Sequence, residues 1–172
     1  MRTKSRGFPP IAARDARVLI LGSLPGQASL AAVQYYAQPQ NAFWRIMGEL
    51  FDAGLDVPYP ERAERLRASG VALWDVCKSA TRPGSLDTSI DLNTVITNDF
   101  ERFFREHPGI VHVCVNGGTA HRLYRRRVQP VLPEPLSSLP LHLLPSTSPA
   151  HASLRFGQKL ERWRLLENLL AA

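Results

Sequence analysis

The chain has 172 residues, of which 44% are hydrophobic and 21% charged, a composition typical of a globular domain and unlike that of a disordered chain. The net charge of +6 favours a polyanionic partner, although an arginine-rich composition can also reflect the genome. No apolar run is long enough to span a bilayer and no signal core follows the basic N-terminus, so we expect no membrane contact and a cytoplasmic protein. We expect one domain over residues 1–172, in which residues 1–14 form a flexible basic arm.

The first half of the chain predicts two strands with two helices between them. Residues 17–22 are apolar throughout, as expected of a strand that is buried on both faces of a parallel sheet. Apolar residues then recur at helical spacing over 41–53, which predicts a first helix. A proline at the start and a glycine at the end favour a second helix over 60–70, and the apolar run 71–76 predicts a second strand.

The second half continues this alternation of strands and helices. A polar loop is expected over 77–85, followed by a helix over 91–107 with Asp91 as its cap. The remaining elements are expected in the order strand 110–115, helix 120–127, proline-rich surface excursion 130–140, strand 141–144 and helix 152–170. The pattern predicts an α/β fold: a three-layer α/β/α sandwich around a central four-stranded parallel sheet.

Loops that are polar or contain glycine follow all four predicted strands, at 22–26, 77–85, 116–119 and 146–151. In an open parallel sheet, the carboxyl ends of neighbouring strands meet at one crevice, where ligands bind. Glycines let the backbone approach a ligand closely, and small hydroxyl side chains add hydrogen bonds without filling the space. The sequence therefore predicts one composite site that is built from both ends of the chain.

Cysteines and metal ligands are sparse in this sequence. Cys77 and Cys114 both lie in apolar runs, which predicts buried free thiols. No cluster of His, Cys and Asp has the spacing of a metal site, so we expect no cofactor.

Four motifs follow one another along the chain: Gly22-Ser23-Leu24-Pro25-Gly26, Tyr35-Tyr36, Asn41-x-Phe43-Trp44 and Ser146-Thr147-Ser148-Pro149-Ala150-His151. In this order they resemble the uracil-DNA glycosylase superfamily, and within it the hypoxanthine-DNA (deoxyinosine) glycosylase branch, which is related to the mismatch-specific uracil/thymine-DNA glycosylases. The resemblance spans residues 17–165 and implies that family's version of the α/β/α fold. It also implies an enzyme that flips a deaminated base, hypoxanthine before uracil, out of DNA and hydrolyses its N-glycosidic bond.

The resemblance implies two catalytic residues. Many members of the superfamily hold the attacking water with Asp or Asn in the first turn, but here that position is Leu24, which cannot form a hydrogen bond. In the hypoxanthine branch the Asn of Asn-x-Phe-Trp takes this duty, which implies Asn41; an ordinary helix N-cap is the alternative. The backbone of Ser23 and its neighbours would stabilise the negative charge on the departing base.

The remaining site residues follow from the same resemblance. Tyr36 would stack on the extruded base, unless it is a core tyrosine. The residues expected to contact the base are otherwise Gly22, Leu24, Pro25, Gly26, Asn116 and Ser146, of which Asn116 can also be a plain turn residue. Those expected to contact DNA are Arg82, Ser85, Ser148, Pro149, Ala150 and His151. Solvated turns are the alternative for Arg82 and Ser85, and a helix start is the alternative for His151.

Two other functions stay open at this point. One is a uracil-specific or mismatch-specific DNA glycosylase of the same superfamily. The other is a damaged-DNA-binding protein without catalysis, because Leu24 and Ser146 both depart from the best-known relatives. We expect a monofunctional enzyme, since no lysine is evident near the site. We expect it to act as a monomer in the bacterial cytosol or nucleoid, on duplex DNA or alternatively on single strands.

Overall fold

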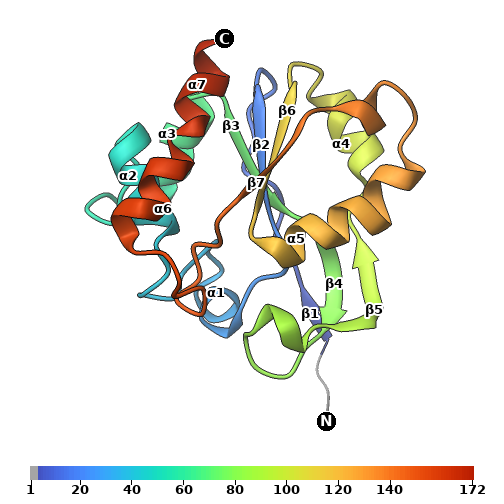
Figure 1. Cartoon of the computed structure of the whole chain (residues 1–172), viewed down its shortest axis with the longest axis horizontal. Helices are drawn as coiled ribbons and strands as arrows, with labels where there is room; N and C mark the ends of the chain where they lie inside the picture. The colour runs from blue at the N-terminus through green and yellow to red at the C-terminus, as the bar shows by residue number, and fades with distance from the viewer. Residues whose placement is uncertain (1–3) are drawn as a thin grey trace.

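Four apolar runs form the central sheet of the computed structural model, which describes residues 4–172 (Figure 1). All pairings are parallel and the strand order is β3-β2-β6-β7. The strands are β2 (Val18–Gly22), β3 (Val71–Asp75), β6 (His112–Asn116) and β7 (Leu141–Leu144). The predicted four-stranded parallel sheet is therefore confirmed.

Helices cover both faces of this sheet, which gives the predicted three layers (Figure 1). One face buries Val18 and Ile20 against α2 (Phe43–Phe51), α3 (Tyr59–Ala68), α6 (Phe156–Trp163) and α7 (Leu165–Ala171). The other face buries Leu19 and Leu21 against α4 (Phe100–Glu106) and α5 (Gly118–Leu123). Because successive strand residues point to opposite faces, a continuous apolar run serves both cores.

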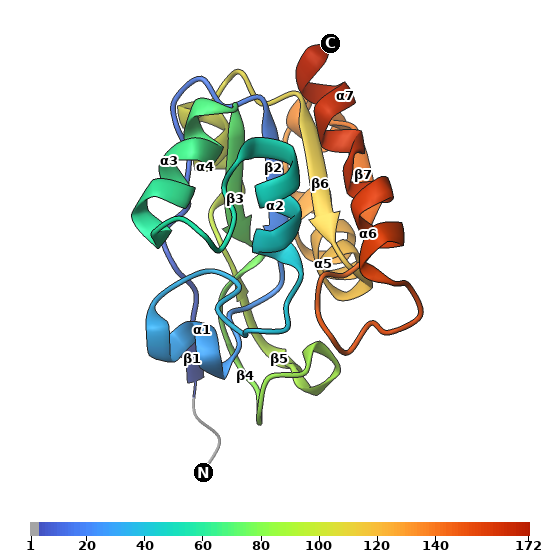
Figure 2. The same cartoon turned by 90° about the vertical axis from the view of Figure 1, so that its left-hand side faces the viewer.

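A second, antiparallel sheet was not expected. It consists of β1 (Lys4–Arg6), β4 (Cys77–Thr81) and β5 (Asp91–Thr97), in the order β1-β4-β5 (Figure 2). The expected loop at 77–85 is therefore a strand in its first part. The expected flexible arm over 1–14 is also wrong for the described part, because β1 pairs with β4 and Ile11 bridges Leu73. Residues 1–3 of that arm lie outside the described residues.

The helix expected over 91–107 is wrong in its first half. Residues 91–97 form β5 instead, and Asp91 does not cap a helix. The segment contains Thr94, Val95 and Ile96 in succession, and β-branched side chains favour the extended backbone. The helix begins only at Phe100, where the Asp99 carboxylate accepts a hydrogen bond from the backbone N–H of Arg102.

The other elements differ from expectation mainly at their ends. The first predicted helix starts at Phe43, with Ala42 rather than Asn41 as its N-cap. The final helix starts at Phe156 and divides into α6 and α7 at Arg164. The helix predicted over 120–127 consists of α5 and the π-helical η2 (Tyr124–Val128). Short helical segments that were not predicted are α1 (Gln27–Ala32), η1 (Asp87–Ser89), η3 (Gln129–Val131) and η4 (Leu136–Ser138).

Cys77 and Cys114 are free thiols, and both are buried, as predicted. Within residues 4–172, no helix has the length and apolar character needed to cross a membrane.

Candidate active site

A pocket of about 560 Å³ opens at the carboxyl ends of β2, β3 and β6. It is lined by Asp75, Arg122 and residues of five segments, within the ranges 22–29, 35–41, 85–88, 116–119 and 146–151. The turn after β2 and the loop after β7 thus meet at one cavity, as the composite-site hypothesis required. Every residue predicted for the site lines this pocket except Arg82, and their proposed chemical roles remain predictions.

The turn 22–26 is held close to the neighbouring strand. The backbone N–H of Val76 donates to the carbonyl of Gly22 at 2.8 Å, and that of Cys77 donates to the carbonyl of Ser23 at 3.0 Å. Within residues 4–172, the N–H groups of Leu24 and Gly26 donate no hydrogen bond. Because unpaired backbone donors next to a cavity favour an acceptor ligand, the turn is suited to bind a base or an anion.

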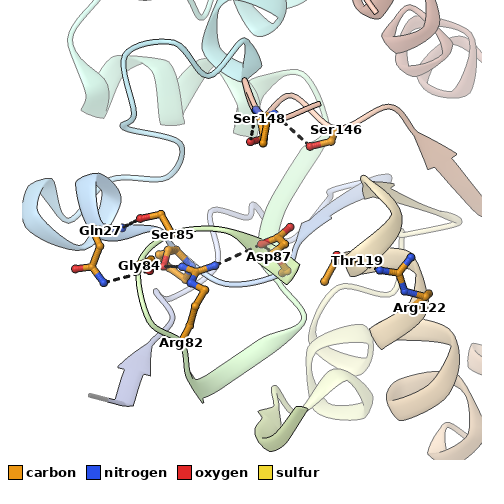
Figure 3. Close-up of polar contacts among 12 residues, drawn as sticks. Gln27, Arg82, Gly84, Ser85, Asp87, Thr119, Arg122, Ser146 and Ser148 are labelled. Carbon is orange, nitrogen blue, oxygen red and sulfur yellow. Dashed lines mark hydrogen bonds and ion pairs between the residues drawn. The ribbon is translucent and has the colours of Figure 1, made fainter. Parts of the chain in front are cut away.

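Arg82 and Asp87, which pair with each other (Figure 3), both form hydrogen bonds with this turn. The Ser23 hydroxyl donates to Oδ1 of Asp87 at 2.6 Å, and Nη1 of Arg82 lies 3.4 Å from the same oxygen. Arg82 also donates through Nη2 to the carbonyl of Pro25. Its residue surface is only 3% exposed, so the guanidinium is not available to a DNA phosphate. The predicted DNA contact of Arg82 is therefore wrong, and the residue shapes the turn instead.

Ser85 lies at the rim of the pocket and is exposed. Its hydroxyl accepts a hydrogen bond from the backbone N–H of Gln27 at 2.9 Å, which ties the rim loop to the start of α1. The side chain of Gln27 adds a longer contact of 3.4 Å to the carbonyl of Gly84 (Figure 3). An exposed hydroxyl at the mouth fits the predicted phosphate contact of Ser85, which stays a prediction.

Asn41 lies in the segment between α1 and α2. Its Oδ1 accepts a hydrogen bond from the backbone N–H of Phe43 at 3.0 Å, so the amide orients the first turn of α2 even though it is not the N-cap. The next residue, Ala42, donates its backbone N–H to the carbonyl of Thr147 at 3.0 Å. Asn41 is thereby fixed to the loop after β7 while it lines the pocket.

The two tyrosines occupy different environments. Tyr35 is a core residue, 4% exposed, whose hydroxyl donates to the carbonyl of Pro9 at 2.8 Å. Tyr36 lines the pocket with a positive φ of 53°, and its ring stacks on Phe43 with centroids 4.2 Å apart. Phe43 therefore supports the ring of Tyr36 from behind, an arrangement that favours Tyr36 over Tyr35 as the stacking platform.

The loop 146–151 is hydrogen-bonded to the carboxyl end of β6. The side-chain amide of Asn116 donates through Nδ2 to the Thr147 hydroxyl at 2.9 Å, and Oδ1 of Asn116 accepts from the Thr147 backbone at 3.0 Å. Thr147 is 1% exposed, so this pair is fully enclosed. Asn116 thus supports the loop as well as lining the pocket, and its predicted contact with the base stays a prediction.

Short hydrogen-bonded turns fix the remainder of this loop. The backbone N–H of Ser148 donates to the Ser146 hydroxyl, and that of Ala150 donates to the Ser148 hydroxyl, both at 3.2 Å (Figure 3). Pro149 and Ala150 are exposed at the rim. The ring of His151 lies 3.3 Å from the hydroxyl of Ser153. These residues therefore present a defined surface at the mouth of the pocket.

Sequence reasoning missed three residues at this site. Asp75 and Arg122 line the pocket, and Lys159 donates from Nζ to the carbonyl of Ser148 at 3.2 Å. A polar residue at the end of an apolar strand was the available signal for Asp75, as it was for Asn116. Lys159 is 5% exposed and had no local signal, because its helix packs against the loop only in the folded chain.

Two carboxyl groups, Asp75 and Asp87, line the pocket together with the guanidinium of Arg122. Burial is the largest cause that raises the pKa of Asp75 to about 7; the neighbouring Asp87 adds to the shift and Arg82 opposes it. Burial also raises the pKa of Asp87, while the hydrogen bond from Ser23 and the charges of Arg82 and Arg122 counteract that shift. Carboxyl groups with raised pKa values in a cleft are typical of functional sites.

Comparison with known proteins agrees with this geometry. The family model for the uracil DNA glycosylase superfamily matches residues 9–169, so the chain belongs to that superfamily. The curated proteins that it resembles include "Hypoxanthine DNA glycosylase" of Methanosarcina barkeri, 38% identical over 115 residues, which are 66% of this chain and 72% of the relative. The protein of the same name from Methanosarcina acetivorans is 37% identical over 116 residues, with 67% and 72% covered.

A solved structure supports the fold over nearly all of the chain. The solution NMR structure of a Methanosarcina acetivorans protein superimposes with a TM-score of 0.78 at 30% sequence identity, covering 97% of this chain and 99% of that one. The resemblance inferred from the sequence motifs is thereby confirmed, together with the predicted fold class.

Proposed function

We propose that this protein is a monofunctional DNA glycosylase that flips a deaminated base out of DNA and hydrolyses its N-glycosidic bond, with hypoxanthine as the main substrate. The observation that carries this proposal is the 560 Å³ pocket shared by the turn 22–26 and the loop 146–151 at the carboxyl edge of the parallel sheet. The curated relatives that carry the name hypoxanthine DNA glycosylase support the choice of base.

The pocket can serve each requirement of this hydrolysis. The bond between the sugar and the base breaks with its electron pair on the base, so donors must face the departing base. The free N–H groups of Leu24 and Gly26 are suited to that task. Tyr36 provides an aromatic face, and the amide of Asn41 holds the water that attacks the sugar. The water supplies its hydroxyl to the sugar carbon and its proton to the base.

The rim is proposed to bind the DNA strand on either side of the extruded nucleotide. Ser148, Pro149, Ala150 and His151 lie on one side, and Ser85 lies on the other. Arg122, which also lines the pocket and is exposed, adds a positive charge there. We propose duplex DNA as the substrate, a monomer as the active form and the cytosol or nucleoid as its location, since DNA is found there.

The test uses duplex oligonucleotides that contain one hypoxanthine, one uracil or no lesion. Purified protein followed by alkali should cleave the strand at hypoxanthine, more slowly at uracil, and not at undamaged bases. Faster cleavage at uracil would favour a uracil-specific enzyme, and retarded mobility without cleavage would favour a binding protein. Cleavage without alkali would contradict the monofunctional mechanism and direct attention to Lys159 beside the loop.

A further inference from the structure

One carboxyl group in the pocket is not used by the mechanism above. Asp75 is the last residue of β3 and pairs with Gly22 in the register of the sheet. It lines the pocket although its residue surface is only 4% exposed, and its Oδ2 atom has no hydrogen-bond partner among the described residues. Buried polar atoms are nearly always paired, so an unpaired carboxyl oxygen beside a ligand pocket points to a partner on the ligand.

The absence of a side chain on Gly22 makes room for this carboxyl group. A Cβ atom on Gly22 would stand 2.5 Å from Oδ1 of Asp75 and 2.5 Å from the hydroxyl oxygen of Tyr36. Both groups therefore converge on the same point of the turn. Since Tyr36 is the proposed stacking residue, a base that lies on its ring comes within reach of Asp75.

The surroundings of Asp75 favour its neutral form. The charged groups that act on it are Asp87, which disfavours a second negative charge, and Arg82, whose guanidinium is already paired with Asp87. The other titratable groups near the carboxyl all have raised pKa values and are neutral at pH 7: Tyr35, Tyr36, Tyr59 and Cys77. With its own pKa raised to about 7, Asp75 holds its proton at and below neutral pH in a large share of molecules.

The other polar side chain at a strand end is already engaged. Both ends of the Asn116 amide bind Thr147, at 2.9 and 3.0 Å. Within the described residues, two buried oxygen atoms of the pocket therefore have no hydrogen-bond partner: Oδ2 of Asp75 and the hydroxyl of Tyr36.

We propose that Asp75 binds the extruded base as a neutral carboxylic acid and donates a hydrogen bond to its ring-carbonyl oxygen. The inference rests on the proposed function and names the group that recognises the base. As the glycosidic bond breaks, its electron pair passes to the base and spreads onto that oxygen, so a donor there binds the transition state more strongly than the substrate. An ionised carboxylate would repel the same charge. The proton remains on Asp75 throughout.

The first experiment measures the pH dependence of kcat/KM for hypoxanthine excision. Wild-type kcat/KM should be level below pH 7 and fall about tenfold per pH unit above it, because only the protonated acid donates. Asp75→Asn retains a donor that does not titrate, so its profile should stay level up to pH 9. Asp75→Ala should be about 10²–10³-fold slower at pH 6. The control Asp99→Asn, an exposed cap of α4, should keep the wild-type profile.

The second experiment needs only the wild-type protein and therefore does not depend on the folding of a variant. An oligonucleotide that carries unsubstituted purine lacks the carbonyl oxygen that Asp75 is proposed to bind. Its excision should show no decline above pH 7, whereas hypoxanthine excision should. The proposal is overturned if both bases show the same pH profile, or if Asp75→Asn keeps the wild-type decline. Failure of the proposed function is distinguishable, since hypoxanthine would then not be excised at any pH.

Discussion

The two walls of the pocket are held in place by different kinds of interaction. The N-terminal wall, residues 22–26, rests on a partly buried ion pair: Arg82 contacts Asp87, and Asp87 accepts from the Ser23 hydroxyl. The C-terminal wall, residues 146–151, is anchored through Thr147, which shares two neutral hydrogen bonds with Asn116.

This difference predicts how each wall responds to a single substitution. Removal of one partner from a buried ion pair leaves a charge without compensation, which costs far more than the pair contributes. Neutral hydrogen bonds contribute about 0.5–1.5 kcal/mol each, so the loss of one is partly tolerated. A single substitution in the ion pair should therefore lower the free energy of unfolding more than a single substitution in the hydrogen bonds of the C-terminal wall.

The largest effect on activity is expected at Asn41, whose neighbour Ala42 donates its backbone N–H to Thr147 in the C-terminal wall. Asn41→Ala should lower the single-turnover rate of hypoxanthine excision by at least about 10²-fold, because the water loses the group that positions it. Binding to lesion DNA should change by only a few-fold, since Ala42 still donates to Thr147. Asn93→Ala, an exposed position on β5, is the control. Excision within a few-fold of wild type would show that another group holds the water.

Next in size is the effect of Arg82 on the free energy of unfolding. Arg82→Met should lower it by about 2–3 kcal/mol, less than for a fully buried pair because the side chain of Asp87 is 40% exposed. The control is Arg105→Met, whose ion pair with Glu101 is exposed and should contribute under about 1 kcal/mol. Denaturant unfolding measures both. Equal midpoints for the two variants would contradict a structural role for the Arg82 pair.

The contrast between the walls also explains what could be predicted from the sequence. The four strands of the parallel sheet were predictable because runs such as Val18–Gly22 are apolar on both faces. The pocket was predictable because parallel strands end at one edge. The second sheet was missed for two reasons. Val95 and Ile96 fit a helical spacing with Phe100, and no glycine or proline marks the end of β5 between them.

Side-chain burial within loops was the harder problem. Arg82 follows a strand that was taken for a loop, and an arginine in a polar loop is normally solvated. Its burial depends on contacts with Pro25, which lies 57 positions earlier in the chain. Lys159 likewise reaches Ser148 only through the packing of α6. Long-range contacts of this kind leave no trace in local composition.

The C-terminal wall is tested through the hydroxyl of Thr147. Thr147→Val should lower the free energy of unfolding by about 1–3 kcal/mol, because Nδ2 of Asn116 loses its acceptor inside an enclosed site. Thr147→Ser keeps the hydroxyl and should recover most of that loss. The decrease for Val should not exceed that for Arg82→Met. A larger decrease would mean that the neutral wall, and not the ionic one, is the more vulnerable.

The smallest effect is expected at Ser85, which is exposed and accepts from Gln27 just after the N-terminal wall. Ser85→Ala removes the acceptor of the Gln27 backbone N–H, but water can replace an exposed hydroxyl, so unfolding should change by under about 1 kcal/mol. If Ser85 binds a phosphate, affinity for lesion DNA should still fall a few-fold. The slope of log affinity against log salt should stay constant, because no charge is removed. Unchanged affinity would show that Ser85 only positions the start of α1 and does not contact DNA. A changed slope would show that the variant also displaces a charged contact such as Arg122.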